Sequence, residues 1–348
     1  MENRIEPQII GGMFGLGEVP SNSNGCTPPF LKGREIFLAN GRCGIWLLIE
    51  LLSPLQVWMP SYLCRGMLPA VDRSAVDVRF YEVGYDLTLP SQEWLGDVRP
   101  GDLVVLIDYF GFPCDSSCAT RAKEQGAWVL EDAAQALLTA SVGRVSDFVV
   151  FSPRKFVGVP DGGILALDRK LEFPCVELSP PPATWWLKAF YAGVLRREFD
   201  LYGGERYWFE LFQETEPAGP IGVYAMSELT EMLLQHSFDY AAIARQRRDN
   251  YAFLAQELAD VALFPNLAAD VVPLGFPIRV RGRNKLRQAL FDHQIYPAVH
   301  WPIQGVVPDR FGDSHKLADE IMTLPCDHRY GQQDMERMVG IILEELRQ

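Results

Sequence analysis

Short apolar runs alternate with helix-like stretches along the first half of the chain. The runs are rich in valine, isoleucine, leucine and aromatic residues, and several end in a turn or an acidic residue, which is typical of buried strands. They lie at residues 55–60, 76–83, 102–111, 127–134, 147–153 and 162–168. Helical spacing occurs between them at residues 41–52, 62–71 and 116–126. This alternation predicts βαβ units and a mostly parallel sheet, with ligands bound at the carboxyl ends of its strands.

The pattern changes in the middle of the chain. Residues 173–186 are rich in proline and predict a surface connection. The spacing of residues 185–202 predicts an amphipathic helix that exposes Lys188, Arg196 and Arg197.

The C-terminal part predicts an α+β layer. A long helix is expected over residues 227–260, and a final helix over residues 332–346. Strand-like runs at 270–280 and 295–301 flank a helical segment at 284–294. We therefore expect an α/β protein with a large domain over residues 1–225 and a small α+β domain over residues 226–348.

Composition narrows the classes of function. The formal net charge of -13 argues against a nucleic-acid binder, which needs a basic surface to displace counterions from phosphates. No apolar run approaches the roughly 18 to 20 residues that span a bilayer, and the N-terminus lacks the features of a signal peptide. Cys114 and Cys118 have no second ligand pair at metal-binding spacing, so reduced thiols are expected rather than a zinc site. These features predict a cytoplasmic protein with neither membrane nor metal.

Three polar features lie at the ends of predicted elements in the large domain. Asp132 ends an apolar run and is followed three residues later by Gln135, and Lys155 follows the next run in "FSPRK". Residues 40–44, "NGRCG", precede a helical stretch, so their amides would form a helix N-terminus of the kind that holds a phosphate.

These features together suit pyridoxal phosphate (PLP), which needs a lysine, a carboxylate beside its ring nitrogen and a phosphate cradle. Asp132 would keep the ring nitrogen protonated, and Gln135 would hydrogen-bond the ring oxygen. Lys155 would move a proton between the substrate and the cofactor. Each feature alone has a simpler interpretation, since a lysine after a strand is commonly a solvated turn residue and an acidic pair there commonly caps a helix. Their order along the chain favours the cofactor site.

The segments "VLEDAAQALL" and "SPRKFVGVPDGGILAL" resemble the DegT/DnrJ/EryC1/StrS family of sugar aminotransferases, which are fold type I PLP enzymes. The resemblance covers residues 35–348, except for residues 171–220. It implies that Lys155 carries the cofactor and that Asp132 and Gln135 contact the ring.

The resemblance also implies a phosphate site at Gly41, Arg42 and Cys43, where the family has a Ser-Gly-Thr type of turn. The family usually has a serine five residues before the lysine. Here that position is Val150, and Ser152 is the nearby substitute.

Two further departures concern aromatic and substrate contacts. The aromatic residue that usually stacks on the ring aligns with Cys64, which leaves Tyr62 as a possible substitute. An Asn-Tyr-Arg-Met segment that reaches the substrate or the neighbouring subunit is replaced by residues 223–226, "VYAM", in which Tyr224 is retained. His300 and Trp301 are further candidates for substrate contact, although a buried structural histidine is an equally good interpretation of His300.

The activity implied by the resemblance is a transamination. An amino donor, expected to be glutamate, would pass its nitrogen to a keto sugar or nucleotide-linked keto sugar in polysaccharide or secondary-metabolite biosynthesis. The family also implies a homodimer with the active site at the subunit interface. Two alternatives remain open: another PLP reaction, such as that of a dehydratase or lyase, and a non-catalytic descendant that binds PLP. The family's sugar dehydratases have histidine in place of the lysine, so Lys155 argues against the first of these.

Overall fold

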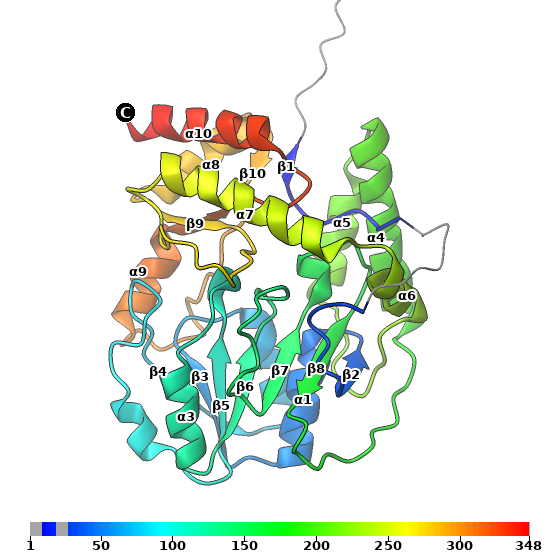
Figure 1. Ribbon diagram of the computed structural model, residues 1–348, viewed down its shortest axis with the longest axis vertical. Helices are drawn as coiled ribbons and strands as arrows, with labels where there is room; N and C mark the ends of the chain where they lie inside the picture. Colours follow the sequence, from blue (N-terminus) through cyan, green and yellow to red (C-terminus); the bar gives the residue numbers. More distant parts are fainter. Residues whose placement is uncertain (1–8, 19–26, 348) are drawn as a thin grey trace, which may run out of the picture.

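A seven-stranded sheet forms the centre of the first part of the chain (Figure 1). The structure is a computed structural model that describes residues 9–18 and 27–347. The strand order is β2-β8-β7-β6-β5-β3-β4. The bounds are Glu35–Leu38 (β2), Gln56–Pro60 (β3), Asp77–Tyr81 (β4), Leu103–Ile107 (β5), Trp128–Asp132 (β6), Phe148–Phe151 (β7) and Gly163–Leu167 (β8).

The pairing within this sheet is mostly parallel. Strands β3 to β7 all run in one direction, and only β8 is antiparallel to its neighbours, β7 and β2. Every residue of β5, β7 and β8 is buried, as expected for a sheet covered on both faces. The predicted fold class, an α/β fold with a mostly parallel sheet, is confirmed.

Helices cover this sheet. Helix α1 (Gly41–Leu52) packs on β7 and β8, and α3 (Ser116–Glu124) packs on β5 and β6. The short helix α2 (Leu68–Arg73) packs on α1. Short 3-10 turns connect these elements at Arg65–Met67, Glu93–Asp97, Tyr109–Gly111 and Pro153–Lys155.

The C-terminal part builds its own hydrophobic core above the sheet (Figure 1). Its elements are α6 (Glu228–His236), α7 (Tyr240–Glu257), β9 (Phe276–Arg279), α8 (Arg283–Asp292), β10 (Ile295–Tyr296), α9 (Gly312–Glu320), β11 (Ile321–Leu324) and α10 (Gln332–Leu346). Strand β1 (Ile10–Gly11) pairs with β10, so the N-terminal segment joins this second core. The domain boundary at residues 225 and 226 stays a prediction.

The predicted long helix over residues 227–260 is two helices in the structure. Ser237 caps the end of α6, and the Asp239 carboxylate then accepts a hydrogen bond from the Ala242 N–H at 2.9 Å. This side-chain bond satisfies a free amide at the start of α7, so a second helix can begin in a new direction.

Helices α4 (Ala183–Tyr202) and α5 (Tyr207–Thr215) form a hairpin beside the sheet (Figure 1). The prediction that Arg196 is exposed was wrong. Its guanidinium lies over the Trp208 ring at 4.5 Å and pairs with Asp200 at 2.8 Å, because α5 folds back over this face of α4. Helix α5 was not predicted.

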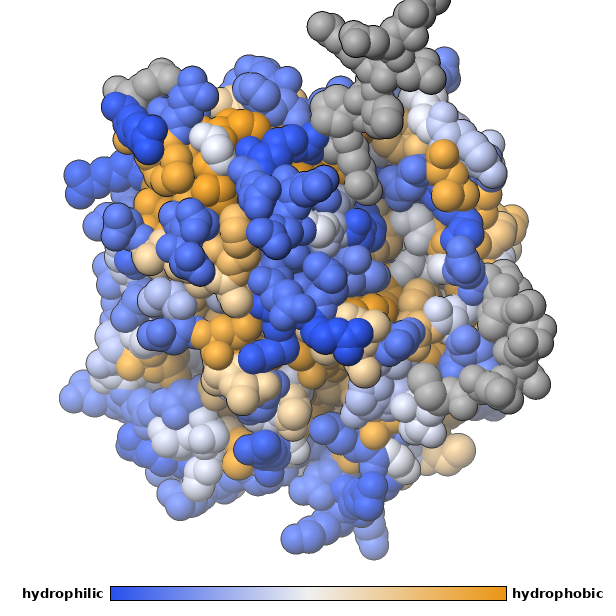
Figure 2. All heavy atoms as spheres, turned by 45° about the horizontal axis from the view of Figure 1, so that its top comes forward, coloured by the Kyte–Doolittle hydropathy of each residue, from blue (hydrophilic) through white to orange (hydrophobic). Residues whose placement is uncertain are grey.

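Apolar side chains remain exposed on the α4–α5 hairpin. Figure 2 shows orange side chains on the right of the view, where this hairpin projects. The large hydrophobic and aromatic side chains that are exposed on this hairpin are Leu187, Tyr191, Leu201, Tyr202, Tyr207 and Phe209. No helix within the described part of the chain is long and apolar enough to cross a membrane.

Candidate functional site

Lys155 lies at the carboxyl end of the sheet, directly after β7. The strand ends at Phe151, and the turn Pro153–Lys155 follows because proline at its first position suits a tight helical turn. The Ser152 carbonyl accepts the Lys155 N–H at 3.1 Å. The Lys155 side chain is partly buried, and within residues 9–18 and 27–347 its amine has no hydrogen bond or ion pair.

Asp132 ends the neighbouring parallel strand, β6. Its Oδ1 accepts a hydrogen bond from the Ala134 N–H at 2.9 Å, which fixes the carboxyl group at the start of the following turn. Burial raises the pKa of Asp132 above its ordinary value. The positive charge of Lys155 opposes this effect but does not cancel it. The structure therefore brings the predicted carboxylate and lysine together.

Gln135 lies in the turn after β6 and is buried. Its Oε1 accepts a hydrogen bond from the Phe110 N–H at 2.7 Å, so its amide group is held in one orientation. Its Nε2 is buried and has no partner in the described part of the chain. A buried donor without an acceptor is costly, so this amide can donate a hydrogen bond to an acceptor on a bound molecule.

His300 and Trp301 lie in the C-terminal part of the chain, and His300 is close enough to Lys155 for its charge to act on the imidazole. The His300 ring contacts Phe110 at 5.6 Å between centroids, and its Nδ1 lies 2.9 Å from Thr323 Oγ1. Burial and then the charge of Lys155 lower the pKa of His300 to about 3, so the imidazole is neutral at pH 7. His300 therefore lies near Lys155 and adds no positive charge to the site at pH 7.

Tyr62 lies beneath Trp301, with ring centroids 5.5 Å apart. The Tyr62 side chain is fully buried, and its hydroxyl lies near the backbone of Trp301. The Tyr109 hydroxyl donates a hydrogen bond to the Tyr62 carbonyl at 2.5 Å, which ties these rings to the end of β5. The stacking role assigned to Tyr62 stays a prediction.

The N-terminus of α1 carries the predicted phosphate turn. The Asn40 side chain caps this helix by accepting a hydrogen bond from the Cys43 N–H at 3.1 Å. Gly41 begins the helix, and Arg42 projects from its first turn. The Arg42 guanidinium donates to the Glu216 carbonyl at 2.7 Å.

The chain segment of residues 216–224 lies over this helix N-terminus. The Pro220 carbonyl accepts hydrogen bonds from Asn40 Nδ2 at 2.9 Å and from Cys43 Sγ at 3.3 Å. The Tyr224 carbonyl accepts the Ala39 N–H at 2.9 Å. Tyr224 therefore lies with the α1 N-terminus, while His300 lies near Lys155 and Trp301 contacts His300.

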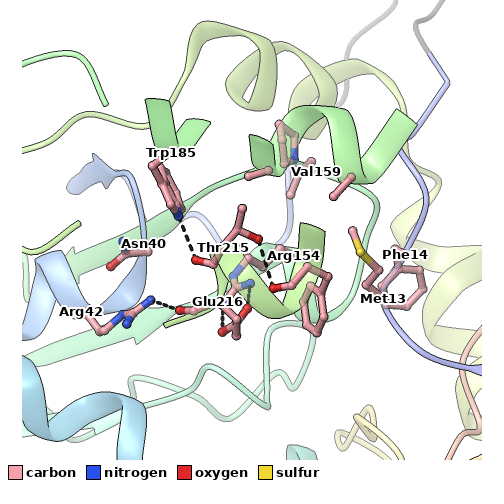
Figure 3. Close-up of a pocket in the computed structure, with 13 residues that line it drawn as sticks. Met13, Phe14, Asn40, Arg42, Arg154, Val159, Trp185, Thr215 and Glu216 are labelled. Atoms are coloured by element: carbon pink, nitrogen blue, oxygen red, sulfur yellow. Dashed lines mark hydrogen bonds and ion pairs between the residues drawn. The ribbon is translucent and has the colours of Figure 1, made fainter. Parts of the chain in front are cut away.

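Arg154 connects the two halves of the site. It precedes Lys155, and its guanidinium binds the Glu216 carboxylate through two bonds of 2.5 and 2.6 Å. Figure 3 shows both residues beside Arg42 and Asn40, around a cavity of about 40 Å³ that α4 and α5 close. Burial alone would raise the pKa of Glu216, but Arg154 and then Arg42 lower it to about 2.

Sequence reasoning missed several residues of this site. Glu216 lies in the part of the chain where no motif was found, so no signal identified it. Phe110 was assigned to the predicted strand at residues 102–111. In the structure it lies in a turn after the strand, with a left-handed φ of 58°. Ser152 is buried at the start of the lysine turn, and its role toward a phosphate stays a prediction.

A buried carboxyl pair lies behind Asp132. The Glu131 carboxylate accepts hydrogen bonds from the Gly143 N–H at 3.0 Å and from Ser146 Oγ at 2.6 Å. Asp108 Oδ1 accepts the Cys114 N–H at 2.7 Å. Burial, followed by the charge of Glu131, raises the pKa of Asp108. These bonds brace the strand ends that carry Asp132 and the Phe110 turn.

Within the part of the chain that the structure describes, the arrangement combines an amine without a hydrogen-bond partner, a carboxylate, an amide donor without an acceptor and two arginines. An amine placed in this way can bind a carbonyl carbon covalently and transfer protons. The arginines and the helix N-terminus can hold an anion at the other end of the site.

Comparisons with known proteins identify the family of the chain. The DegT/DnrJ/EryC1/StrS aminotransferase family matches residues 100–343. Gly41, Arg42, Cys43 and Tyr62 lie outside the matched residues. No curated protein sequence matches the chain.

Several solved structures share the fold. The aminotransferase TlmJ from Streptoalloteichus hindustanus is 20% identical, with a TM-score of 0.65 over 90% of this chain and 87% of that chain. The sugar aminotransferase CalS13 from Micromonospora echinospora is 19% identical, with a TM-score of 0.63 over 89% and 87% of the respective chains. NtdA from Bacillus subtilis, with bound cofactor PMP, is 16% identical, with a TM-score of 0.65 over 90% and 73%.

Proposed function

Because the chain belongs to the DegT/DnrJ/EryC1/StrS aminotransferase family, we propose that it is a PLP-dependent transaminase that aminates a keto sugar or a nucleotide-linked keto sugar. Glutamate is the expected amino donor, and the amino sugar would enter polysaccharide or secondary-metabolite biosynthesis. Similarity to solved sugar aminotransferases supports this substrate class.

The residues at the carboxyl end of the sheet fit the cofactor. The amine of Lys155 is available for its aldehyde, and Asp132 is close enough to Lys155 for the two charges to interact. Gln135 Nε2 is a buried donor without a partner, as a donor to the ring oxygen would be before the cofactor binds. Ser152, Gly41, Arg42 and Cys43 would bind the phosphate. The observation that carries the proposal is that, among the described residues, the Gln135 Nε2 donor and the Lys155 amine, which follow neighbouring parallel strands, both have no hydrogen-bond partner.

Each of these groups has a defined task in amino transfer. The cofactor, when bound, supplies an electron sink that stabilises negative charge on the substrate carbon. Asp132 would lie beside the ring nitrogen and favour its protonated form, because burial strengthens an ion pair. Lys155 would act as the base that removes a proton from the substrate carbon and as the acid that returns it.

The small domain and the α1 segment would bind the substrate. We propose that His300 and Trp301 contact the substrate beside Lys155, and that Tyr224 contacts it from the side of the α1 N-terminus. His300 is neutral at pH 7, so it can donate or accept a hydrogen bond from a sugar hydroxyl without repelling the positive lysine.

We also propose that the protein acts in the cytoplasm as a homodimer with its active site at the subunit interface. Apolar side chains are exposed on the α4–α5 hairpin, next to the cavity at Arg154. They support a contact with a second subunit at this surface. Gel filtration with light scattering tests this part, and a monomer that still binds cofactor would contradict it.

Covalent capture of the cofactor tests the proposed function. Purified protein incubated with PLP should show a visible absorption band near about 420 nm, and borohydride should attach the cofactor to Lys155 in a peptide identified by mass spectrometry. K155A should lose the band, whereas K170A, which removes an exposed lysine, should keep it. Absence of the band from the wild type would refute PLP binding.

Glutamate then distinguishes a transaminase from a lyase. Added without an acceptor, it should convert the band to one near about 330 nm, because the amino group stays on the cofactor. Release of ammonia with retention of the original band would instead indicate a lyase or dehydratase.

A further inference from the structure

Glu216 lies where it can compete with a phosphate. Its carboxylate binds Arg154 through two parallel bonds, and Arg154 is the residue that precedes Lys155. Its backbone carbonyl accepts a hydrogen bond from Arg42, in the first turn of α1. Figure 3 shows the carboxylate between these two arginines, in the cavity under α4 and α5.

The charges around Glu216 form an anion site. Arg42, Arg154 and Lys155 all act on the Glu216 carboxylate, and together they hold it in its ionised form. A guanidinium binds a carboxylate and a phosphate with the same fork geometry. Glu216 therefore occupies Arg154 in the way that a bound phosphate would.

The Arg154–Glu216 pair is accessible enough to be displaced. The Arg154 side chain is 27% exposed and the Glu216 side chain 41% exposed. A partly exposed ion pair contributes little net stability, since water screens it. A phosphate dianion carries more charge than the carboxylate and offers more acceptor oxygens to the same fork.

The end of the α4–α5 hairpin carries this carboxylate. Glu216 follows the last residue of α5, Thr215, whose carbonyl accepts a hydrogen bond from Trp185 Nε1 at 3.0 Å. The Gly219 and Pro220 segment that follows packs on Arg42 and Asn40. Rotation of the Glu216 side chain can thus free Arg154 while these contacts stay in place.

We propose that Glu216 is an internal competitor for the cofactor's phosphate, and that it sets the affinity of the site for phosphate by occupying Arg154. This inference rests on the proposed function, and it assigns Arg154 as a phosphate ligand. If Glu216 instead only held Arg154 in position, removing its charge would weaken the binding of phosphate rather than strengthen it.

Equilibrium binding by the full-length protein distinguishes the two arrangements. E216Q keeps the size of the side chain and removes its charge, so it should bind PLP and inorganic phosphate about three- to tenfold more tightly than the wild type. Its affinity for pyridoxal, which lacks the phosphate, should not change. E214Q is the matched control, because Glu214 lies in the last turn of α5, just before Glu216, in an exposed pair with Lys188. Titration calorimetry with phosphate and absorbance titration with PLP and pyridoxal measure these affinities.

A second variant tests the assignment of Arg154. In an R154Q background, the change E216Q should no longer alter phosphate affinity, because the group for which the two anions compete is absent. Matching far-ultraviolet circular dichroism and urea midpoints would show that the variants are folded.

Three results would overturn the inference. E216Q could bind phosphate no more tightly than E214Q does, or it could bind phosphate more weakly than the wild type does. It could also gain the same affinity for pyridoxal as for PLP. Failure of the proposed function looks different, because the wild type would then form no borohydride-stable bond at Lys155, while calorimetry with phosphate would still test Glu216.

Discussion

Burial controls the charge of individual side chains at this site. His300 is enclosed by Phe110 and Trp301, and its Nδ1 is paired with Thr323, so its protonated form is poorly solvated. The nearby Lys155 charge acts in the same direction. A neutral imidazole at pH 7 is therefore a property of the folded protein.

This shift predicts how stability depends on pH. The pKa of His300 is about 3 in the folded protein, below its ordinary value of 6.5. Because the unfolded chain binds the proton more tightly, His300 stabilises the fold above pH 6.5, and this contribution is lost as the pH falls toward 3. Between pH 7.5 and 5.5 the wild type should lose about 1 kcal/mol more than H300Q in urea unfolding. H293Q, at an exposed histidine, should follow the wild type, and equal slopes for wild type and H300Q would contradict the assignment.

Close backbone contacts position the elements around the site. Gly163 begins β8 and lies against the Asn40 carbonyl and the Gly41 amide, so a methyl group there would overlap the start of α1. Gly340, in the exposed face of α10, has no atom near its missing Cβ. Gly163 therefore has no room for a side chain, whereas Gly340 has room for one.

Alanine at these two glycines should have opposite effects. G163A should reduce the free energy of unfolding by about 2 to 3 kcal/mol, because backbone atoms must move. It should also weaken phosphate binding at the displaced helix N-terminus. G340A should raise the free energy of unfolding by about 1 kcal/mol, since alanine favours the helix. Urea unfolding of both variants measures these changes, and a loss of stability in G340A would contradict the expected result.

Arg247 joins the two parts of the molecule. It is fully buried in α7, and its guanidinium donates hydrogen bonds to the carbonyls of Phe156 at 3.2 Å and of Leu274 at 2.9 Å. Phe156 follows Lys155, and the Leu274 N–H in turn donates to the Phe110 carbonyl at 2.8 Å. One side chain of the C-terminal part therefore supports both turns of the proposed cofactor site.

Replacement of Arg247 should destabilise the whole molecule. R247M leaves several buried carbonyls without donors, so the free energy of unfolding should fall by about 3 kcal/mol. PLP affinity should fall as well, because the Lys155 turn loses its support. R245A removes an exposed arginine of the same helix and should change neither quantity. If R247M were destabilised but bound PLP with unchanged affinity, Arg247 would not support the Lys155 turn in a way that affects PLP binding.

Local patterns in the sequence were enough to predict the strands of the sheet and to propose residues that bind the cofactor ring. The six predicted strands are all present, and the predicted helix at residues 41–52 has the observed bounds of α1. Asp132, Gln135 and Lys155 could be proposed from the sequence because each lies within a few residues of a strand end, where the direction of the chain decides its position. Such signals depend only on neighbours along the chain.

Tertiary structure alone decided the surroundings of these residues. Arg196 was expected at the surface, but a helix with no sequence signal of its own places Trp208 over it. Arg154 meets Glu216 across 61 intervening residues, and His300 reaches Phe110 from the other end of the chain. Contacts of this kind depend on how whole elements pack, and that packing determines which charges are paired, which are buried and which donor remains free for a cofactor.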